Sequence, residues 1–334
     1  MPDSPIPRGS STAPLRPRAE EVRSRLLGSA LRSPHDFIRE VSVEADWRFW
    51  VESQTASRPE SIDLSVVWEG PGGPLVAFAS MLPWDSEFFG IRTARLDALV
   101  HLDSPGYAIR QDLVPAIRDI TDHVAKFGVE YFFAVVDARD AAVCRSLAEC
   151  GFGLIESRLT HFRHLGDFAP PERASVKIAT EQDVATLQAA AVRMSNSYDR
   201  FHADPRLPLD LVDRLMSRWV TASVLEGFAD ATVIPAEGPA DAFCTVKYHR
   251  DRWAPMGIRI SQTVFGAVST ERRGWYRKLI SEIHCMFRDA GVECAYLVTQ
   301  PSNRAVIRTW ERLGFQFGRN ELVFRKWLGQ DTRR

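Results

Sequence analysis

The feature that most constrains this chain of 334 residues is an internal repeat. Residues 128–152 (GVEYFFAVVDARDAAVCRSLAECGF) align without a gap with residues 291–315 (GVECAYLVTQPSNRAVIRTWERLGF), and nine of the 25 positions are identical. Each copy has the pattern of a glycine that ends one helix, an apolar strand, a short loop, a second helix and a Gly-Phe pair that begins another strand. Repetition at a fixed offset indicates duplicated structural units, so we expect an α/β (α+β) chain with two related domains.

The segments before the two copies extend the repeat, but the turns that lead into them differ. Residues 113–127 and 276–290 both have the apolar spacing of a helix that packs on the strand after it. The turn before the second helix, STERRGWY, contains Arg272, Arg273 and Gly274, whereas the turn before the first, YAIRQDLV, has no glycine. A glycine turn at a helix start presents unpaired backbone N–H groups and the positive end of the helix dipole, so only the second copy is expected to bind a phosphate group.

Composition narrows the classes of partner. The net charge of −1 provides no large basic surface, so we do not expect nucleic acid as a partner. No apolar run reaches the roughly 18–20 residues of a membrane span, so we expect no membrane association. The five cysteines form no C-x-x-C pair and lie mostly in apolar stretches, which indicates free thiols in a cytoplasmic protein. No His, Asp and Glu residues have the spacing of metal ligands, so we expect no metal.

Residues 262–316 resemble the Gcn5-related N-acetyltransferase (GNAT) superfamily. In that family a strand leads into a loop of pattern Q/R-x-x-G-x-G/A, and a later helix carries the pattern N-x-x-A-x-x-x-Y-x-x-x-G-F. The positions that match are Gly274, Asn303, Gly314 and Phe315. The positions that depart are Glu271 in place of Gln or Arg, Tyr276 in place of Gly or Ala, Val306 in place of Ala, and Trp310 in place of Tyr.

A narrower resemblance, over about residues 80–327, is to relatives of dTDP-fucosamine acetyltransferase, which carry a degenerate N-terminal GNAT-like half. The segments that carry it are LPWDSEFFG (82–90), YDRFHADPRLP (198–208) and VTQPSN (298–303). The resemblance implies a degenerate GNAT-like domain at 71–168, without a coenzyme A loop, and a catalytic GNAT domain at 173–328. Before these we expect a disordered, proline-rich tail at 1–20 and an N-terminal extension at 21–70, whose role the sequence does not indicate.

The resemblance implies a tandem GNAT-like fold, with mixed central sheets flanked by helices, that uses acetyl-CoA. Two adjacent parallel strands, near 262–269 and 293–299, would diverge so that backbone groups of the first hold the pantetheine arm and the thioester carbonyl. The expected cofactor-binding residues are Phe265, Gly266, Ala267, Val268, Arg272, Arg273, Gly274, Trp275, Tyr276, Asn303 and Val306. The first copy has no glycine turn and carries Asp140 in place of Asn303, so we expect it to bind no coenzyme A.

Trp310 occupies the position of the tyrosine acid in the family. Seven residues are almost two helical turns, so Trp310 lies on the same helix face as Asn303 and is expected to face the cleft. An indole N–H can donate a hydrogen bond but cannot act as a general acid, so Trp310 either assists the leaving thiolate by a hydrogen bond or fills the core. Tyr276 and Ser302 are candidate replacement donors.

The loop between the predicted helices near 181–194 and 208–220 supplies the candidate base and the acceptor site. His202 is the predicted general base, with a loop-stabilising hydrogen bond as its alternative role. Two other histidines are less suited, because His284 lies on the apolar side of its helix and His249 lies beside a predicted surface hairpin turn. The residues expected to bind the acceptor are Asp199, Arg200, Phe201, His202 and Asp204.

The sequence therefore favours an acetyl-CoA-dependent N-acyltransferase that acts on a small-molecule amine, with a nucleotide-linked amino sugar as the first choice by resemblance. An antibiotic or peptide amine is an alternative acceptor. The departures at Glu271, Tyr276 and Trp310 also allow a coenzyme A-binding sensor or subunit without catalysis. The sequence leaves a homodimer open.

Overall fold

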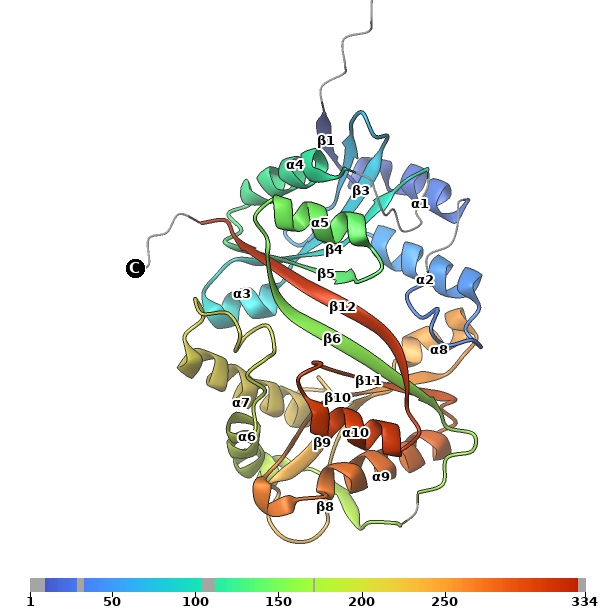
Figure 1. Cartoon of the computed structure of the whole chain (residues 1–334), viewed down its shortest axis with the longest axis vertical. Coiled ribbons are helices and arrows are strands. Elements are labelled where there is room, and N and C mark those ends of the chain that lie inside the picture. The colour runs from blue at the N-terminus through green and yellow to red at the C-terminus, as the bar shows by residue number, and fades with distance from the viewer. Residues whose placement is uncertain (1–9, 29–32, 104–111, 171, 330–334) are drawn as a thin grey trace, which may run out of the picture. The chain divides into compact units, whose positions relative to one another are not determined.

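The structure is a computed structural model that describes residues 10–28, 33–103, 112–170 and 172–329. These residues form two compact units, whose elements are labelled in Figure 1. Unit 1 comprises Met1–Asp36, Val43–Glu156 and Asn320–Arg334, and unit 2 comprises Phe37–Ser42 and Ser157–Arg319. Each unit is a mixed sheet flanked by helices, which confirms the predicted fold class.

The sheet of unit 1 has the strand order β1-β2-β3-β4-β5-β12. Neighbouring strands are antiparallel except β4 and β5, which are parallel. The part of β12 that pairs with β5 is Glu321–Trp327. The strands are β1 (Ser11–Pro14), β2 (Val66–Glu69), β3 (Leu75–Met81), β4 (Thr93–His101), β5 (Tyr131–Asp137) and β12 (Gln316–Trp327), and the helices are α1 (Ala19–Leu27), α2 (Val43–Thr55), α3 (Pro83–Phe89), α4 (Val114–Ala125) and α5 (Ala141–Glu149).

Both faces of this sheet are covered, and β3 is therefore buried along its whole length. Side chains alternate between the two faces of a strand, so Ala77 packs with the core formed by α4 and α5, while Val76 and Phe78 pack with α1 and α2. The continuous apolar run of β3 is typical of a strand that is enclosed on two sides.

The sheet of unit 2 has the strand order β7-β8-β9-β10-β11-β6. Here β10 and β11 are parallel and the other neighbours are antiparallel. Helix α9 covers the sheet with the fully buried side chains of Leu279, Ile280, Ile283 and Phe287. The strands are β6 (Gly153–His164), β7 (Val176–Ile178), β8 (Ala231–Pro235), β9 (Ala242–Lys247), β10 (Ile260–Val268) and β11 (Cys294–Thr299), and the helices are α6 (Val184–Arg193), α7 (Leu209–Leu225), α8 (Arg250–Met256), α9 (Trp275–Asp289) and α10 (Arg304–Arg312).

The predicted repeat is present in the structure. Helices α4 and α9 coincide with the predicted helices to within two residues, and each is followed by a strand that runs parallel to the strand before the helix. Helices α5 and α10 then follow β5 and β11. The two units therefore share the order strand, helix, parallel strand, helix.

The N-terminal region differs from the prediction. Within the predicted disordered tail, Ser11–Pro14 forms β1, and Arg16–Arg18 forms a short 3-10 helix, while residues 1–9 lie outside the described part of the chain. Segment 21–70 supplies α2 and β2, as well as most of α1. The physical reason is that its apolar residues recur at helical spacing and bury against β3 and β4. The domain boundaries that the resemblance implies stay a prediction.

No described helix is both long and apolar enough to cross a bilayer. Likewise, no three or more His, Cys, Asp or Glu side chains of the described residues lie together in a way that could hold a metal ion.

Replacement of Trp47 in α2 tests whether segment 21–70 is an integral part of unit 1. The ring is 1% exposed and stacks on Trp50, and its indole N–H donates to the carbonyl of Leu26 at 2.9 Å. Trp47→Ala is expected to lower the free energy of unfolding by about 3–5 kcal/mol, because a large buried ring leaves a cavity. Trp47→Phe should cost less, since it keeps an aromatic ring and loses mainly the hydrogen bond.

The measurement is urea unfolding, with Leu154→Ala, which truncates a mostly exposed side chain of β6, as the control. Equal midpoints for Trp47→Ala and Leu154→Ala would show that α2 contributes little to the core.

Candidate functional site

The candidate site of unit 2 begins where β10 and β11 separate. Their parallel pairing ends at Thr263 opposite Leu297, although the strands continue to Val268 and Thr299. On its other edge β10 shifts register against β9 between Thr263 and Gly266. Such a bulge bends a strand and ends its regular pairing. The predicted divergence of these two strands is therefore present, and among the described residues no strand pairs with this edge of β10 beyond Thr263.

The backbone of β10 is uncovered at this fork. Gly266 is exposed, and a Cβ atom there would lie 2.8 Å from Sγ of Cys244 and 3.1 Å from the carbonyl of Phe243, so no larger residue fits without movement. Phe265 donates its N–H to Oγ1 of Thr245 at 3.0 Å and stacks its ring on Trp219 of α7. Gly266 thus exposes main chain at the fork, beside the exposed side chain of Val264. The other two predicted residues here, Ala267 and Val268, are buried and half-buried.

The turn after β10 is a glycine-capped helix start, as predicted. Gly274 has φ of 90°, in the left-handed region that favours glycine, and no atom lies within 4 Å of the position that a Cβ would take. The N–H groups of the first turn of α9, from Trp275 onward, have no acceptor within the helix. Arg272 donates to Asp241 at 3.0 Å and to two carbonyls of the neighbouring loop, so its charge is partly used inside the protein. Arg273 is exposed.

Trp310 and Tyr276 meet beside this fork. Trp310 is 1% exposed and packs in the core of unit 2, and its indole N–H donates to the hydroxyl of Tyr276 at 2.9 Å. The ring of Tyr276 reaches within 3.7 Å of the Cβ position at Gly266. Burial raises the pKa of Tyr276 well above 10, so this phenol is neutral near pH 7. The prediction that Trp310 faces the cleft is therefore wrong, because the other side of α10 is charged and the indole packs inward.

The start of α10 carries Asn303 and Val306. Asn303 donates from Nδ2 to Oγ1 of Thr299 at 3.2 Å, which links the helix to the end of β11. Val306 packs against the core of unit 2, and Ser302 is exposed.

The loop between α6 and α7 is held together by Asp199. One carboxylate oxygen accepts the N–H groups of Phe201 and His202 at 2.8 and 3.0 Å, and the other lies 2.7 Å from Nδ1 of His202. The His202 side chain is only 7% exposed, and the hydrogen bond to Asp199 raises its pKa against the opposing effect of burial. This is the geometry of the loop-stabilising alternative, and a catalytic role for His202 stays a prediction.

The other predicted acceptor residues divide by exposure. Phe201 and Asp204 are buried, and Asp204 accepts the N–H of Arg206 at 3.1 Å. The guanidinium of Arg200 lies over the ring of Phe201, 3.9 Å from its centre, and is partly exposed. Asp199 and Arg200 are therefore the members of the set that are more accessible to an acceptor.

One contact that the sequence does not indicate ties this loop to the fork. Asn196 donates from Nδ2 to Oε1 of Gln300, the residue that directly follows β11. The predicted acceptor loop is thus anchored at the end of one of the two diverging strands.

A second arrangement missed from the sequence surrounds His249. Its Nε2 lies 3.1 Å from the hydroxyl of Tyr296 and 3.2 Å from Oε1 of Gln262. The predicted surface hairpin turn is wrong, because His249 immediately precedes the short helix α8 and is partly buried. No spacing in the sequence marks these contacts. His284, in contrast, is fully buried among aromatic rings, and burial lowers its pKa to about 3, so it is a neutral core residue.

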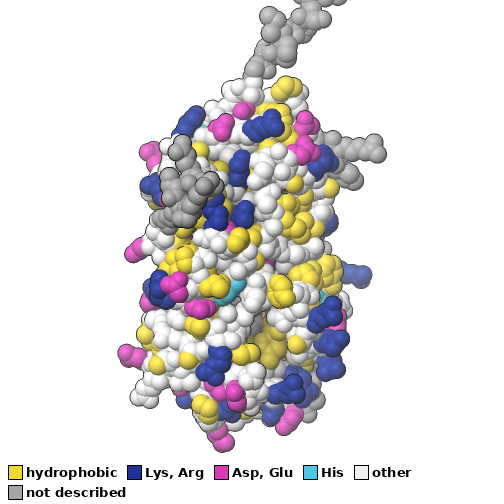
Figure 2. Space-filling model, turned by 60° about the vertical axis from the view of Figure 1, so that its left-hand side comes forward, with side chains coloured by type: hydrophobic (Ala, Val, Ile, Leu, Met, Phe, Trp, Pro, Cys, Tyr) yellow, Lys and Arg dark blue, Asp and Glu magenta, His cyan; other side chains and the backbone are white. Residues whose placement is uncertain are grey.

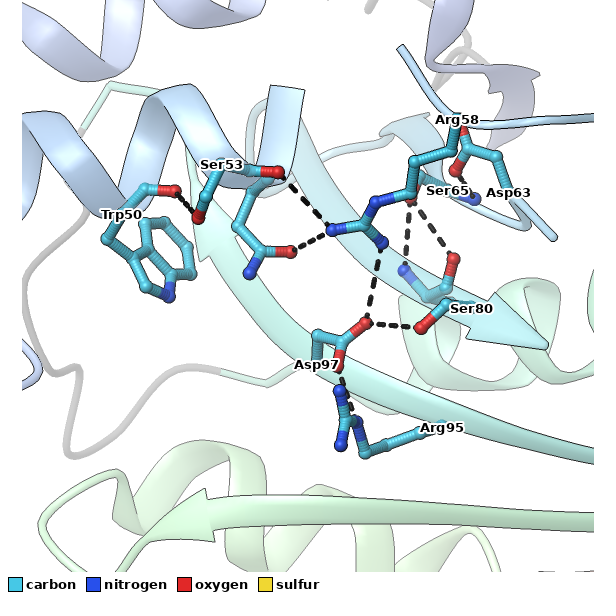
Figure 3. Close-up of polar contacts among 10 residues, drawn as sticks. Trp50, Ser53, Arg58, Asp63, Ser65, Ser80, Arg95 and Asp97 are labelled. Atoms are coloured by element: carbon cyan, nitrogen blue, oxygen red, sulfur yellow. Dashed lines mark hydrogen bonds and ion pairs between the residues drawn. The ribbon is translucent and has the colours of Figure 1, made fainter. Parts of the chain in front are cut away.

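Unit 1 contains a similar fork with different chemistry. The parallel pairing of β4 with β5 ends at Leu96 opposite Ala134, and β4 shifts register against β3 at Asp97. The Asp97 carboxylate accepts from Oγ of Ser80 at 2.7 Å and from Nε of Arg95 at 2.5 Å, and Arg58 lies 3.8 Å away (Figure 3). The bulge of β4 therefore carries a charged cluster. The turn 107–114, which the sequence comparison contrasts with the glycine turn, lies mostly outside the described residues.

The surface in Figure 2 is hollowed in the lower part of the face shown, over hydrophobic side chains, and Lys and Arg side chains gather near this hollow. An apolar hollow with basic groups at its margin suits a ligand that has both an apolar part and an anionic part.

Comparisons with known proteins give similarity at the level of the fold. No protein-family model and no curated protein sequence matches the chain. A GCN5-related N-acetyltransferase from Sphaerobacter thermophilus is similar in structure, with a TM-score of 0.60 and 14% identity over 97% of both chains. A tandem GNAT protein from the clavulanic acid biosynthesis pathway has a TM-score of 0.52 and 14% identity over 97% of this chain and 100% of that one.

A third similar structure is the glucosamine N-acetyltransferase region of a fungal multi-domain β-N-acetylglucosaminidase, with a TM-score of 0.60 and 12% identity over 98% of this chain and 39% of that one. These similarities show that the chain has a tandem GNAT fold, as predicted.

The His202–Asp199 pair makes a prediction about pH. Because the pKa of His202 is raised in the folded protein, the pair stabilises the fold below the ordinary histidine pKa near 6.5, and this contribution is lost as pH rises through the raised value. The loss of melting temperature caused by His202→Gln should therefore be larger at about pH 6 than at about pH 9.

His123→Gln on α4 is the matched control, because burial lowers the pKa of His123 and the expected pH dependence has the opposite sign. Equal effects of His202→Gln at the two pH values would contradict the assigned ion pair.

Proposed function

We propose that this protein is an acetyl-CoA-dependent N-acyltransferase that acetylates a small-molecule amine. The observation that carries the proposal is the fork of β10 and β11, which opens directly before the glycine-capped start of α9. The first element has an edge that no longer pairs with β11, and the next presents a helix N-terminus that favours phosphate. A donor with a diphosphate at one end and a thioester at the other needs both.

The residues present suit coenzyme A. The diphosphate would bind the N–H groups of Gly274, Trp275 and Tyr276, where the missing side chain of glycine leaves open space, with Arg273 as an exposed cation. The pantetheine arm would follow the uncovered edge of β10 from Phe265 to Val268. Asn303 and Val306, at the start of α10, would border the arm on the other side, and Arg272 would act by fixing the turn through Asp241.

The chemistry supplied by the protein is positioning and charge stabilisation. Backbone N–H groups of β10 would stabilise the oxyanion that forms when the amine attacks the thioester carbonyl. Orientation of the two reactants can contribute roughly 7–11 kcal/mol, so no strong acid is required. The departing thiolate, whose pKa is ordinarily about 8.5, needs only a hydrogen bond or a proton.

Tyr276 is the proposed donor to the thiolate, and Trp310 positions it. The phenol is neutral near pH 7, lies beside Gly266, and accepts the indole N–H of Trp310. A hydroxyl that accepts one hydrogen bond becomes a better donor of the next. The hydroxyl that the GNAT pattern places at position 310 would thus come from α9 instead of α10.

The loop of Asp199, Arg200, Phe201, His202 and Asp204 is proposed to bind the acceptor. Its anchor to Gln300 supports this role, since it holds the loop at the end of β11. Asp199 and Arg200 would contact polar groups of the acceptor, while the buried Phe201 and Asp204 shape the loop. His202 is a candidate base whose ring is oriented by Asp199.

The proposed acceptor is a nucleotide-linked amino sugar. Two observations support this acceptor. Segments 82–90 and 198–208 resemble relatives of dTDP-fucosamine acetyltransferase. The fold of the chain is similar to a structure described as a glucosamine N-acetyltransferase region. We place the protein in the cytoplasm, because its cysteines are free thiols. Unit 1 is proposed to bind no coenzyme A, since its bulge carries the charged pair of Asp97 and Arg95, where unit 2 has a glycine.

Replacement of Gly274 tests the donor site. Gly274→Val should abolish acetyl-CoA binding in calorimetry, because a branched side chain would fill the space over the helix start and strain the left-handed backbone. Gly227→Val is the matched control, since Gly227 of unit 2 has φ of 71° and also has open space at its Cβ position. Wild type should bind one acetyl-CoA per chain and release free thiol with at least one amine of a panel of glucosamine, nucleotide-linked amino sugars and peptide amines.

Two other outcomes would change the proposal. Binding retained by Gly274→Val would move the diphosphate site elsewhere. Binding without thiol release for every amine would favour a coenzyme A-binding sensor or subunit, an alternative consistent with the burial of Trp310.

Tyr276→Phe tests the donor to the thiolate. The variant keeps the ring beside Gly266 and removes only the hydroxyl that accepts from Trp310. We expect kcat to fall by roughly 10²-fold, the lower end of the range for proton-transfer groups, with the Kd of acetyl-CoA unchanged. An unchanged kcat would leave the thiolate to take its proton from water without help.

A further inference from the structure

The side chains of Gln262 and Tyr296 lie side by side at the base of the fork in unit 2. These residues are register partners in the parallel pairing of β10 and β11, one position before the last pair. On β11 the neighbours Ala295 and Leu297 are buried in the core under α9. Since side chains alternate along a strand, Tyr296 points to the opposite face of the sheet, where it is partly exposed.

The residue that contacts the acceptor loop lies on the same side of β11 as Tyr296. Tyr296, Val298 and Gln300 are separated by two residues each and are all partly exposed. Gln300 accepts the hydrogen bond from Asn196 of the acceptor loop. Tyr296 therefore lies on the strand that anchors this loop, at the point where the two strands open.

His249 contacts both partners across the end of this strand pair. Its Nε2 lies 3.1 Å from the hydroxyl of Tyr296 and 3.2 Å from Oε1 of Gln262, and its ring is stacked nearly parallel to the ring of Tyr296. The three residues come from the segment after β9, from β10 and from β11, so the sheet itself fixes their relative positions.

The backbone of His249 is in an unusual conformation. It is the only residue other than glycine with positive φ in the described part of the chain, at 52°. A left-handed backbone conformation costs free energy at a residue with a side chain. It persists where surrounding contacts fix the residue, and such residues cluster at functional sites. Here the strained turn aims the imidazole at the hydroxyl of Tyr296.

The equivalent position of unit 1 lacks this chemistry. The pair one position before the end of the β4–β5 pairing is Arg95 and Phe133, and Phe133 aligns with Tyr296 in the sequence repeat. Arg95 is turned into the ion pair with Asp97 (Figure 3). Two forks of the same backbone design therefore differ in that only the one beside the glycine turn carries a hydroxyl in contact with a histidine.

We propose that Tyr296 and His249 are the proton acceptor for the attacking amine, a role that rests on the proposed N-acyltransferase function. The ammonium of the acceptor gives one proton to the oxygen of Tyr296, which passes its own proton to Nε2 of His249, and the neutral amine then forms its bond to the thioester carbon. The carbon–sulfur bond breaks, the nitrogen loses its second proton and the thiolate takes up one, so the amide and the free thiol are the products, and the imidazolium returns its proton to water. Oε1 of Gln262 accepts the hydrogen bond of the imidazolium that forms.

The charged side chains next to His249 along the chain pair with one another or with a ring rather than with the imidazole. Lys247 contacts Asp230 at 3.2 Å, Asp230 also accepts the N–H of Tyr248 at 2.7 Å, and the guanidinium of Arg250 lies 4.4 Å from the centre of the Tyr248 ring. Of the groups that contact His249 in these hydrogen bonds, Tyr296 is the titratable one and Gln262 is neutral.

The experiment compares Tyr296→Phe, His249→Asn and the double variant in the full chain. Asparagine is chosen because it tolerates the left-handed backbone, and Tyr248→Phe is the matched control, since it removes the hydroxyl of a neighbouring tyrosine. Thiol release from acetyl-CoA is followed from about pH 6 to about pH 10, with glucosamine as the probe amine and also without amine, where water is the nucleophile. Calorimetry measures the Kd of acetyl-CoA.

We expect each single variant to lower kcat by about 10²-fold near pH 7, with little change in Kd. The deficit should shrink as pH rises above the pKa of the acceptor ammonium, and the double variant should be no slower than the singles, because the two groups act as one unit. Tyr248→Phe should behave as wild type.

Unchanged rates in Tyr296→Phe and His249→Asn, or losses that are additive and independent of pH, would overturn the proposal. The same follows if the pH-dependent loss appears in His202→Gln instead, which would assign the base to His202. Acetyl-CoA binding without thiol release above buffer in wild type, with glucosamine, with the rest of the amine panel and with water, would refute the N-acyltransferase function and the base with it.

Discussion

The bulge in β10 is the constraint on which the rest of the candidate site depends. A parallel ladder continues only while both strands keep their direction, and the shift of register between Thr263 and Gly266 turns β10 away from β11. From that point, within the described residues, β10 pairs with a strand on one edge only. A side chain at Gly266 would collide with β9, so the bulge also requires its glycine. The proposed oxyanion donors lie on β10 beyond this bend, and Tyr296 lies opposite Gln262, just before it.

The two units share a backbone arrangement but differ in the side chains at their forks. Both have a bulged strand that separates from its parallel neighbour at equivalent points, Leu96 in unit 1 and Thr263 in unit 2. In unit 1 the bulge carries Asp97, whose charge is neutralised and hydrogen-bonded by Arg95 and Ser80. A buried carboxylate with these partners is costly to move, which makes the first fork a rigid packing element. The bulge of the second fork, between Thr263 and Gly266, carries no charged side chain.

The parts of the structure that could be predicted from sequence are those whose signals are local. The repeat, the amphipathic helices and the glycine turn at Gly274 depend on residues a few positions apart, and they are where they were expected. The sequence does not indicate the role of segment 21–70, because this role depends on the face of β3 that its helices bury. Trp310 had two readings at the sequence level, and only the position of Tyr276, 34 residues away, decides between them.

The same limit applies to the candidate site. Arg272 looks like a free cation in the sequence, but Asp241, 31 residues earlier, holds it. His249 contacts residues 13 and 47 positions away, and no periodicity relates them. Long-range pairs of polar side chains leave no trace in a single sequence, since each partner alone has the pattern of an ordinary surface residue.

The strand order has a consequence for how the chain is made. The sheet of unit 1 is completed by residues 321–327, which the ribosome produces almost 190 residues after Tyr131–Asp137, the strand they border. During synthesis one edge of β5 therefore stays unpaired until β12 has been made. An unpaired strand edge can pair with strands of other chains. Cutting the gene at the repeat boundary would separate unit 1 from its own last strand, so the duplication visible in the sequence does not mark a place where the protein can be divided.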